Sequence, residues 1–111
     1  MESILNSCNL IIKKSLIHGW GVFTQENILK DQTITQSVVV KIPVGEYCPI
    51  NILTYVYTYE NSLFLSLGHA NLINSSNNPN SRFEIDLENN IITIIATRDI
   101  FINEEITLKY L

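Results

Sequence analysis

The first candidate for chemistry in this chain is a short glycine motif near its N-terminus. Gly19 and Gly21 flank the bulky Trp20, and glycine lets the main chain adopt positive φ and approach a ligand closely. Such a loop can present its N–H and C=O groups to a bound molecule. An ordinary tight turn has the same residue pattern, so the motif by itself predicts either a turn or a ligand loop.

A second candidate is the Asn-rich segment 74–80. It directly follows the apolar pair Leu72-Ile73, which places Asn74 at the edge of the predicted core. An Asn side chain donates and accepts hydrogen bonds at once, which suits a zwitterionic or adenine-bearing ligand. A surface loop rich in Asn, Ser and Pro is the alternative interpretation of the same composition.

The third candidate is a set of tyrosines. Aromatic walls with hydroxyl tips can hold an ammonium group by cation–π contact and hydrogen bonds. Core or sheet-face packing is the expected role of Tyr57 and Tyr59, which leaves Tyr55 and Tyr110 as candidates for a site. Neither His18 nor His69 has a Ser or Cys partner in a nucleophile motif, so hydrolase chemistry has no support here. The pair Glu104-Glu105 is expected to be a solvated cap rather than an acid/base pair.

The elements that must position these residues are predicted to be mainly short strands. Ile and Val dominate the apolar residues, and β-branched side chains favour strands. The run Val38–Val40 suggests a strand buried on both faces, whereas Leu63–Ile73 has a helical pattern. The predicted strands are Asn9–Lys14, Val22–Gln25, Thr33–Ile42, Leu53–Tyr59, Phe83–Leu87, Ile91–Ala96 and Ile106–Tyr110, with a hairpin turn at 88–90. The expected fold class is mostly β (α+β) with few short helices.

Composition limits the classes of partner. The net charge is −4 and the seven Lys and Arg residues are scattered, so direct nucleic-acid binding is not expected, because it normally needs a basic stripe. An acidic chain suits a cationic partner instead, such as a basic peptide. No apolar run approaches the roughly 20 residues that span a bilayer, and no signal peptide is visible. Together with the isolated Cys8 and Cys48, this predicts a soluble, intracellular protein without a metal site.

Taken in order, three motifs resemble the SET domain family of protein-lysine methyltransferases. Residues 15–23 (SLIHGWGVF) are similar to the family's opening S-x-I-x-G-x-G-V/L-F, and residues 66–80 are similar to the stretch ending in N-H-S-x-x-P-N. Residues 104–110 (EEITLKY) look like G-E-E-L/I-T-x-x-Y. The short chain is most similar to small stand-alone viral and bacterial SET proteins. The resemblance implies one minimal domain, residues 1–111, without pre-SET or post-SET segments.

The resemblance also implies a site and a mechanism. S-adenosylmethionine is the expected cofactor, held by His18, Gly19, Trp20 and Gly21 together with Asn74 and Ser75. The last two motifs are expected to cross as a pseudoknot, which brings Tyr110 to the transferred methyl group. Tyr110 and Tyr55 are the expected catalytic residues, Phe83 and Leu108 are expected to lie along the lysine channel, and no metal is required. The implied partner is a lysine-containing protein or basic peptide, with a histone tail as one candidate.

Three positions depart from the family pattern. Ser75 stands where the family has the His of N-H-S, which predicts reduced activity, because serine is too short to replace the imidazole without a water. Asn103 replaces the usual Gly before the two glutamates, and Asn tolerates positive φ well enough to keep the turn. Lys109 stands where Asp, Ser or Ala is more common.

Two functions of different class fit these observations. One is an active protein-lysine methyltransferase, which a histone substrate would place in the nucleus. The other is a SET-like module that binds cofactor or a basic peptide with little or no turnover, which Ser75 and the sequence's end at Leu111 favour. A small core leaves marginal stability, so a homodimer is a further hypothesis.

Overall fold

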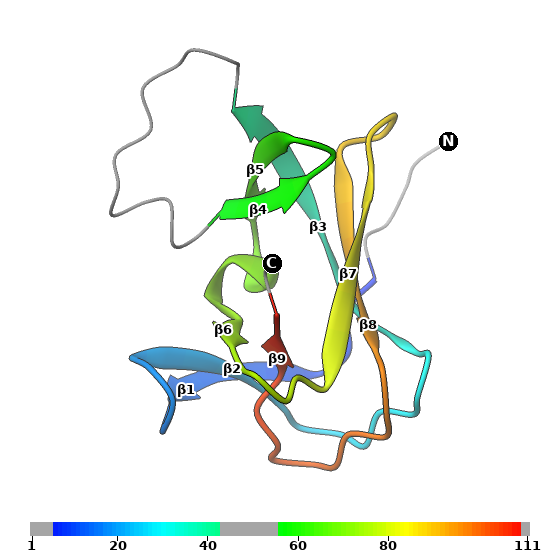
Figure 1. Cartoon of the computed structure of the whole chain (residues 1–111). Coiled ribbons are helices and arrows are strands. Elements are labelled where there is room, and N and C mark those ends of the chain that lie inside the picture. Colours follow the sequence, from blue (N-terminus) through cyan, green and yellow to red (C-terminus); the bar gives the residue numbers. More distant parts are fainter. Residues whose placement is uncertain (1–5, 43–55, 110–111) are drawn as a thin grey trace.

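The structure, a computed structural model, describes residues 6–42 and 56–109, which form three small sheets and one 3-10 turn (Figure 1). The largest sheet has the order β4-β5-β3-β8-β7, and all its neighbouring strands are antiparallel. A β1–β2 hairpin and a short parallel β6–β9 pair complete the fold. The bounds are β1 Leu10–Lys14, β2 Trp20–Thr24, β3 Thr33–Ile42, β4 Val56–Tyr59, β5 Ser62–Leu67, η1 His69–Leu72, β6 Asn74–Ser75, β7 Ser81–Asp86, β8 Ile91–Ala96 and β9 Thr107–Leu108. This confirms the predicted mostly-β fold class of several small sheets.

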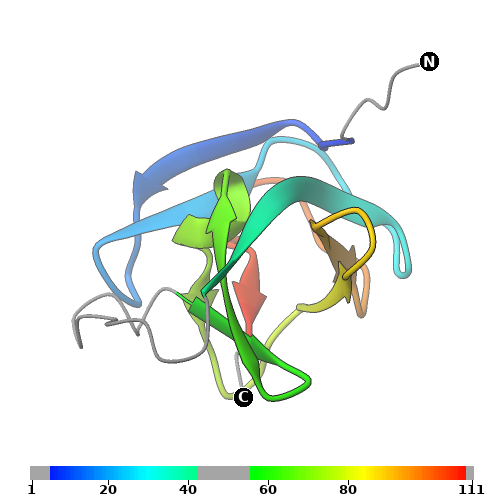
Figure 2. The same cartoon turned by 90° about the horizontal axis from the view of Figure 1, so that it is seen from above.

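The core forms between the five-stranded sheet and the two smaller pairs. On β8 the burial alternates, with Ile92 and Ile94 fully buried and their neighbours only partly covered, as expected for a strand with one face on the core. Ile106 and Leu108 are also fully buried. Figure 2 shows why: β9 lies in the middle of the molecule with the other strands around it.

The helical prediction for Leu63–Ile73 is wrong. Residues 62–67 form β5, which pairs with β3 on one side and β4 on the other, and only His69–Leu72 turns as a single 3-10 segment. A short apolar run fits either a strand or a buried helix by periodicity alone. Pairing with two neighbouring strands decides for the strand, because it satisfies the main-chain hydrogen bonds on both edges.

The prediction that β3 is buried on both faces is also wrong. Val39 is 2% exposed, but Val38 and Val40 are 44% and 48% exposed on the opposite face. That face continues onto β5, where Leu67 lies opposite Val38 and is 57% exposed. The apolar run therefore reflects an apolar outer sheet face rather than a second covered one.

Turn residues behave as their chemistry predicts. The β7–β8 hairpin closes through Asp86, whose carboxylate accepts hydrogen bonds from the N–H groups of Glu88 and Asn89 and from the Asn89 side chain. These bonds hold the pKa of the exposed Asp86 below its usual value, led by the Asn89 side chain. Asn103 has φ of +75°, which confirms that Asn replaces Gly at this turn without losing the left-handed conformation.

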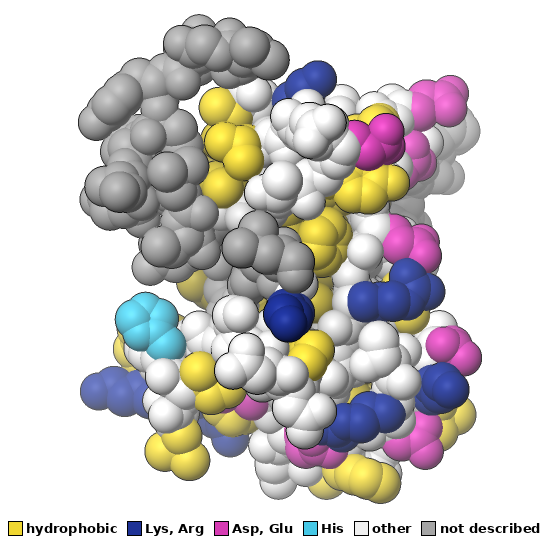
Figure 3. Space-filling model, viewed as in Figure 1, with side chains coloured by type: hydrophobic (Ala, Val, Ile, Leu, Met, Phe, Trp, Pro, Cys, Tyr) yellow, Lys and Arg dark blue, Asp and Glu magenta, His cyan; other side chains and the backbone are white. Residues whose placement is uncertain are grey.

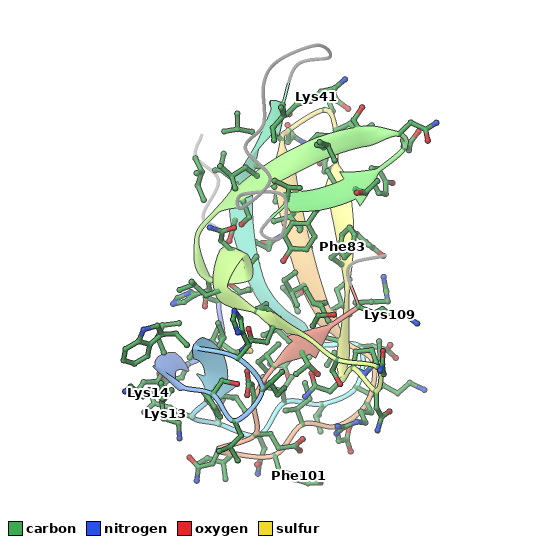
Figure 4. The ribbon with its side chains drawn as sticks, turned by 60° about the vertical axis from the view of Figure 1, so that its left-hand side comes forward. Lys13, Lys14, Lys41, Phe83, Phe101 and Lys109 are labelled. Atoms are coloured by element: carbon green, nitrogen blue, oxygen red, sulfur yellow. The ribbon has the colours of Figure 1, made fainter. Side chains whose placement is uncertain are left out.

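Charged side chains of both signs lie on the surface. On the side formed by β7 and β8, Figure 3 shows acidic side chains together with Lys and Arg, and Arg82 forms an ion pair with Glu84. Basic residues are dispersed, with Lys13 and Lys14 at the opposite end of the molecule from Lys41 (Figure 4). Within the described ranges no helix has both the length and the apolar character needed to cross a membrane.

The C-terminal segment passes between β6 and the beginning of β7. On one side β9 pairs with β6, and the Ser76 N–H donates to Leu108 O at 2.8 Å. On the other side Asn80, which is 2% exposed, accepts from Thr107 N–H at 2.9 Å and donates to Glu105 O at 2.8 Å. Ser81 adds a bond from its hydroxyl to Thr107 O. The loop 76–79 joins these two sides, so residues 105–108 cross it in the manner predicted for the two motifs (Figure 1).

Asn80→Ala should lower the free energy of unfolding by about 2 kcal/mol or more, because it leaves Thr107 N–H and Glu105 O buried without partners. Chemical denaturation measures this change. Asn78→Ala in the same loop is the matched control, since Asn78 is exposed and only its main-chain N–H is bonded, to Ser76. Equal stabilities of the two variants would contradict the structural role of Asn80.

Candidate functional site

The glycine loop is shaped by a serine at its entrance. The Ser15 hydroxyl accepts hydrogen bonds from Ile17 N–H at 2.8 Å and from His18 N–H at 3.3 Å. The Ser15 N–H in turn donates to Gly19 O at 2.7 Å, and Gly19 adopts φ of +44°, where glycine is favoured. The segment is therefore a tight turn, one of the two structures that its residue pattern predicts. The Ser15 hydroxyl stabilises this turn by accepting bonds from two of its main-chain N–H groups.

The side chain of Asn74 stabilises the same loop by bonding to two of its carbonyl groups. Its amide nitrogen lies 2.9 Å from His18 O and 3.1 Å from Trp20 O. Asn74 occupies this place because η1 ends just before it and β6 pairs it with Thr107 on β9. The fold thus brings together the first two predicted motifs, which are 54 to 56 positions apart in the sequence.

Glu105 joins these groups, and the expectation that Glu104-Glu105 is a solvated cap is wrong for it. Its carboxylate lies 2.7 and 2.9 Å from the Ser15 hydroxyl and 2.8 Å from the Asn74 amide nitrogen. Glu104 does act as a cap: it accepts from Phe101 N–H at 2.8 Å and pairs with Arg98 at 3.4 Å. The two adjacent glutamates have separate roles because the main chain turns one toward the loop and the other toward solvent.

Gly21 is required by the closeness of this carboxylate. A β-carbon at Gly21 would collide with the Glu105 carboxylate and lie 3.1 Å from the Ser15 β-carbon. Gly19 is different, since no described heavy atom lies within 4 Å of the position that its β-carbon would take. Gly21 thus leaves room for the Glu105 side chain, whereas Gly19 leaves open space beside exposed main chain.

That open space is what a bound cofactor would need. Gly19 and Trp20 are exposed, and Asn74 lies half-buried behind them. Ser75, also exposed, pairs through its main chain with Leu108, so its neighbourhood adjoins the C-terminal segment. Of the predicted cofactor residues, His18, Gly19, Trp20 and Ser75 are exposed, whereas Asn74 is half-buried and Gly21 is buried. The polar main-chain groups beside the open space at Gly19 fit a ligand with an amino-acid end.

The predicted channel residues lie deeper in the fold. Leu108 is fully buried on β9, and Phe83 is half-buried on β7 with its ring against Tyr57, at 4.8 Å between ring centroids. Tyr57 is itself fully buried and donates to Ala70 O, which confirms its packing role. Figure 4 shows Phe83 on the side of the molecule where the described chain ends at Lys109. Tyr55 and Tyr110 lie outside the described residues.

Other reactive groups contribute little to this site. The half-buried Cys8 thiol has a raised pKa, chiefly because burial disfavours the thiolate and also because Glu26 is near, while a bond from Gln32 opposes the shift. A raised pKa keeps the thiol protonated and weakly nucleophilic. The second cysteine, Cys48, lies outside the described residues. Over the described ranges, no three His, Cys, Asp or Glu side chains are grouped to hold a metal ion.

Comparison with known proteins gives the family. Residues 19–111 match the sequence model of the SET domain, so this chain belongs to the SET domain family. Over 98 residues it is 33% identical to a histone-lysine N-methyltransferase of Schizosaccharomyces pombe described as specific for histone H3 lysine-37. The match covers 83% of this chain and 66% of that relative, so the chain spans just under two thirds of its length.

The architecture agrees with this membership. The crystal structure of a Plasmodium falciparum protein assigned as a histone methyltransferase superposes with a TM-score of 0.83 at 33% sequence identity. The superposition covers 96% of each chain. The SET-domain fold predicted from the three motifs is thereby confirmed.

Sequence reasoning missed three residues that build the site. Ser15 and Glu105 stand inside the first and last motifs, but the sequence predicts no role for Ser15, only a solvated cap for Glu105 and only a loop position for Asn80. Their positions within the motifs were the available signal. Their partners were not visible, because each contact joins residues that are 25 or more positions apart.

Gly21→Ala should lower the free energy of unfolding by about 1–3 kcal/mol, the usual cost of forcing an extra carbon into a packed place. Gly19→Asn is the matched control, because the space beside Gly19 is open and Asn tolerates positive φ. Chemical denaturation compares the two. A smaller loss for Gly21→Ala than for Gly19→Asn would show that the Glu105 carboxylate does not occupy this place.

Proposed function

We propose that this domain transfers a methyl group from S-adenosylmethionine to the ε-amine of a lysine in a protein substrate. The observation that carries the proposal is that Asn74 bonds to the Gly19–Gly21 loop and also pairs with β9, the strand that precedes Tyr110 in the sequence. Membership of the SET domain family and the two histone methyltransferase relatives support the same activity.

The residues that would hold the cofactor are those of the loop and its support. Main-chain groups of His18, Gly19, Trp20 and Gly21 would hold the amino-acid end, with Asn74, and the main chain of Ser75 would meet the adenine. When bound, S-adenosylmethionine supplies the methyl group of its sulfonium, which passes to the lysine nitrogen as the carbon–sulfur bond breaks.

The protein must present the lysine amine unprotonated. A free lysine has a pKa of about 10.4, so the proton has to leave before the nitrogen can attack. A channel of low polarity favours the neutral amine by desolvation. Phe83 and Leu108 would supply such walls, while the hydroxyl groups of Tyr110 and Tyr55 would orient the nitrogen.

A basic segment of a protein is the proposed substrate, and a histone tail is the first candidate. Glu84 pairs with Arg82, but the exposed Asp86 and Glu88 lie at the far end of the strand that carries Phe83, and they would attract a cationic peptide toward this end of the molecule. The two relatives are described as histone methyltransferases. A histone substrate would place the protein in the nucleus.

The alternative is a SET-like binding module with little or no turnover. Ser75 favours it, because the family's imidazole at this position helps to fix the region of the catalytic tyrosine. Ser75 is exposed, and a serine side chain is too short to replace the imidazole contact unless a water bridges the gap. Cofactor affinity is expected under both functions, whereas turnover is expected only under the first.

Wild-type protein incubated with isotopically labelled S-adenosylmethionine and a panel of core histones and basic peptides should place label on lysine. Tyr110→Phe should reduce the rate at least about 100-fold, a typical contribution of a positioned catalytic hydroxyl, while cofactor affinity measured by calorimetry stays near the wild-type value. Tyr59→Phe is the control, since Tyr59 lies on β4 beside core strand β5. Cofactor binding without label on any substrate would favour the binding module.

We also propose that the outer face of the five-stranded sheet forms a homodimer contact. Val38 lies opposite Leu67 on β5 and Ile91 on β8, so exposed and half-exposed apolar side chains adjoin across three strands. Contiguous apolar surface of this kind marks interaction sites, and a domain of this size gains stability by covering it.

Sedimentation or light scattering at micromolar concentration should give the mass of a dimer, and Val38→Lys should give that of a monomer because it puts a charge in the contact. Glu88→Lys, at the exposed β7–β8 turn, is the control for the change of charge. A monomeric wild-type mass would refute the dimer.

A further inference from the structure

Two side chains hold the glycine loop, and both depend on the same carboxylate. Ser15 fixes the N–H groups of Ile17 and His18, and Asn74 fixes the carbonyl groups of His18 and Trp20. The Ser15 hydroxyl and the Asn74 amide nitrogen each also donate to Glu105, at 2.7 and 2.8 Å. Both side chains that bond to the main chain of the loop are therefore bonded to Glu105.

The side chain of Glu105 suits both donors, whose bonds use its two oxygens. A carboxylate accepts at both oxygens and donates at neither. The Ser15 hydroxyl already accepts two main-chain bonds, so its proton is committed to Glu105, and the Asn74 nitrogen can only donate. A glutamine at position 105 would replace one of the two oxygens near the Ser15 hydroxyl, at 2.7 and 2.9 Å, by an NH₂ group that cannot accept its proton.

The main chain of Glu105 is itself fixed from several sides. Asn80 donates to Glu105 O, and the residues on either side of Glu105 bond to β2, with Thr24 N–H to Glu104 O at 3.1 Å and Ile106 N–H to Val22 O at 2.7 Å. The position of the carboxylate is consequently fixed by its own main chain. The same segment continues through Leu108 to Tyr110 in the sequence.

We propose that Glu105 is a positioning residue that holds the cofactor loop in its binding conformation before the cofactor arrives. Preorganisation of this kind raises affinity because the loop does not have to be ordered on binding. Glu105 also ties the loop to the segment that carries Tyr110. The proposal rests on the function proposed above, but its first consequence, an altered loop, is measurable without any cofactor.

Trp20 makes that measurement possible. It is the one tryptophan of the chain, it lies inside the loop, and the residue is 57% exposed. Its fluorescence emission and its quenching by acrylamide therefore report on the loop alone. Glu105→Gln should change both signals in the cofactor-free protein, whereas Glu104→Gln, the adjacent residue that bonds to Phe101 and Arg98, should leave them at their wild-type values.

The expected change in cofactor affinity follows from the loss of one hydrogen bond to a charged group. Glu105→Gln should raise the dissociation constant of S-adenosylmethionine, titrated by Trp20 quenching, about tenfold. Turnover at saturating cofactor should fall much less, because the bound loop recovers its conformation. A merely structural role would instead lower the melting temperature and the active fraction, with the dissociation constant of the folded protein unchanged.

Ser15→Ala provides a second test if Glu105→Gln does not fold, since it removes one partner of the carboxylate and should shift Trp20 quenching and cofactor affinity in the same direction. Unchanged Trp20 signals in the variant that folds would overturn the proposal, as would wild-type affinity with a reduced rate. Altered Trp20 signals in a protein whose wild-type form binds no cofactor would support the loop anchor and refute the proposed methyl transfer.

Discussion

The structure depends on how the buried C-terminal segment satisfies its polar main chain. Residues 106–108 are 7% exposed or less, and a buried N–H or C=O without a partner is costly. The two-residue strand pair supplies only part of the bonds. Ile106 N–H bonds to Val22 O on β2, and the side chains of Asn80 and Ser81 bond to the N–H and the C=O of Thr107. The crossing of the two segments is a consequence of this requirement, because the partners lie on both sides of the chain.

The candidate site follows from the same crossing. The main chain of residues 104–106 is bonded to β2 and to Asn80. The Glu105 side chain therefore lies against Gly21, where a β-carbon would collide with it. The carboxylate then meets Ser15 and Asn74, and these two fix the loop. Stability and ligand binding thus share one set of contacts, which explains why the site residues lie in motifs far apart in the sequence.

The exposed surface of the five-stranded sheet differs in polarity from one strand to another. The outer sheet face is apolar around Val38, whereas the neighbouring edge strand β7 alternates Arg82, Glu84 and Asp86 toward solvent. Charged residues on an edge strand protect it from unwanted pairing. Arg82 and Glu84 form an ion pair on this strand, so charges of both signs line the edge.

The sequence by itself determined the family, the β-rich class and the turns. Motif order identified the fold, and local chemistry was enough for the β7–β8 hairpin and for Asn103 at positive φ, because each depends on neighbouring residues only. The tertiary structure alone decided that residues 62–67 form a strand, that Val38 and Val40 face outward, and that Glu105 joins the motifs. Each of these depends on which distant segments pack together; Ser15 and Glu105 are 90 positions apart, and no local pattern encodes a contact of that span.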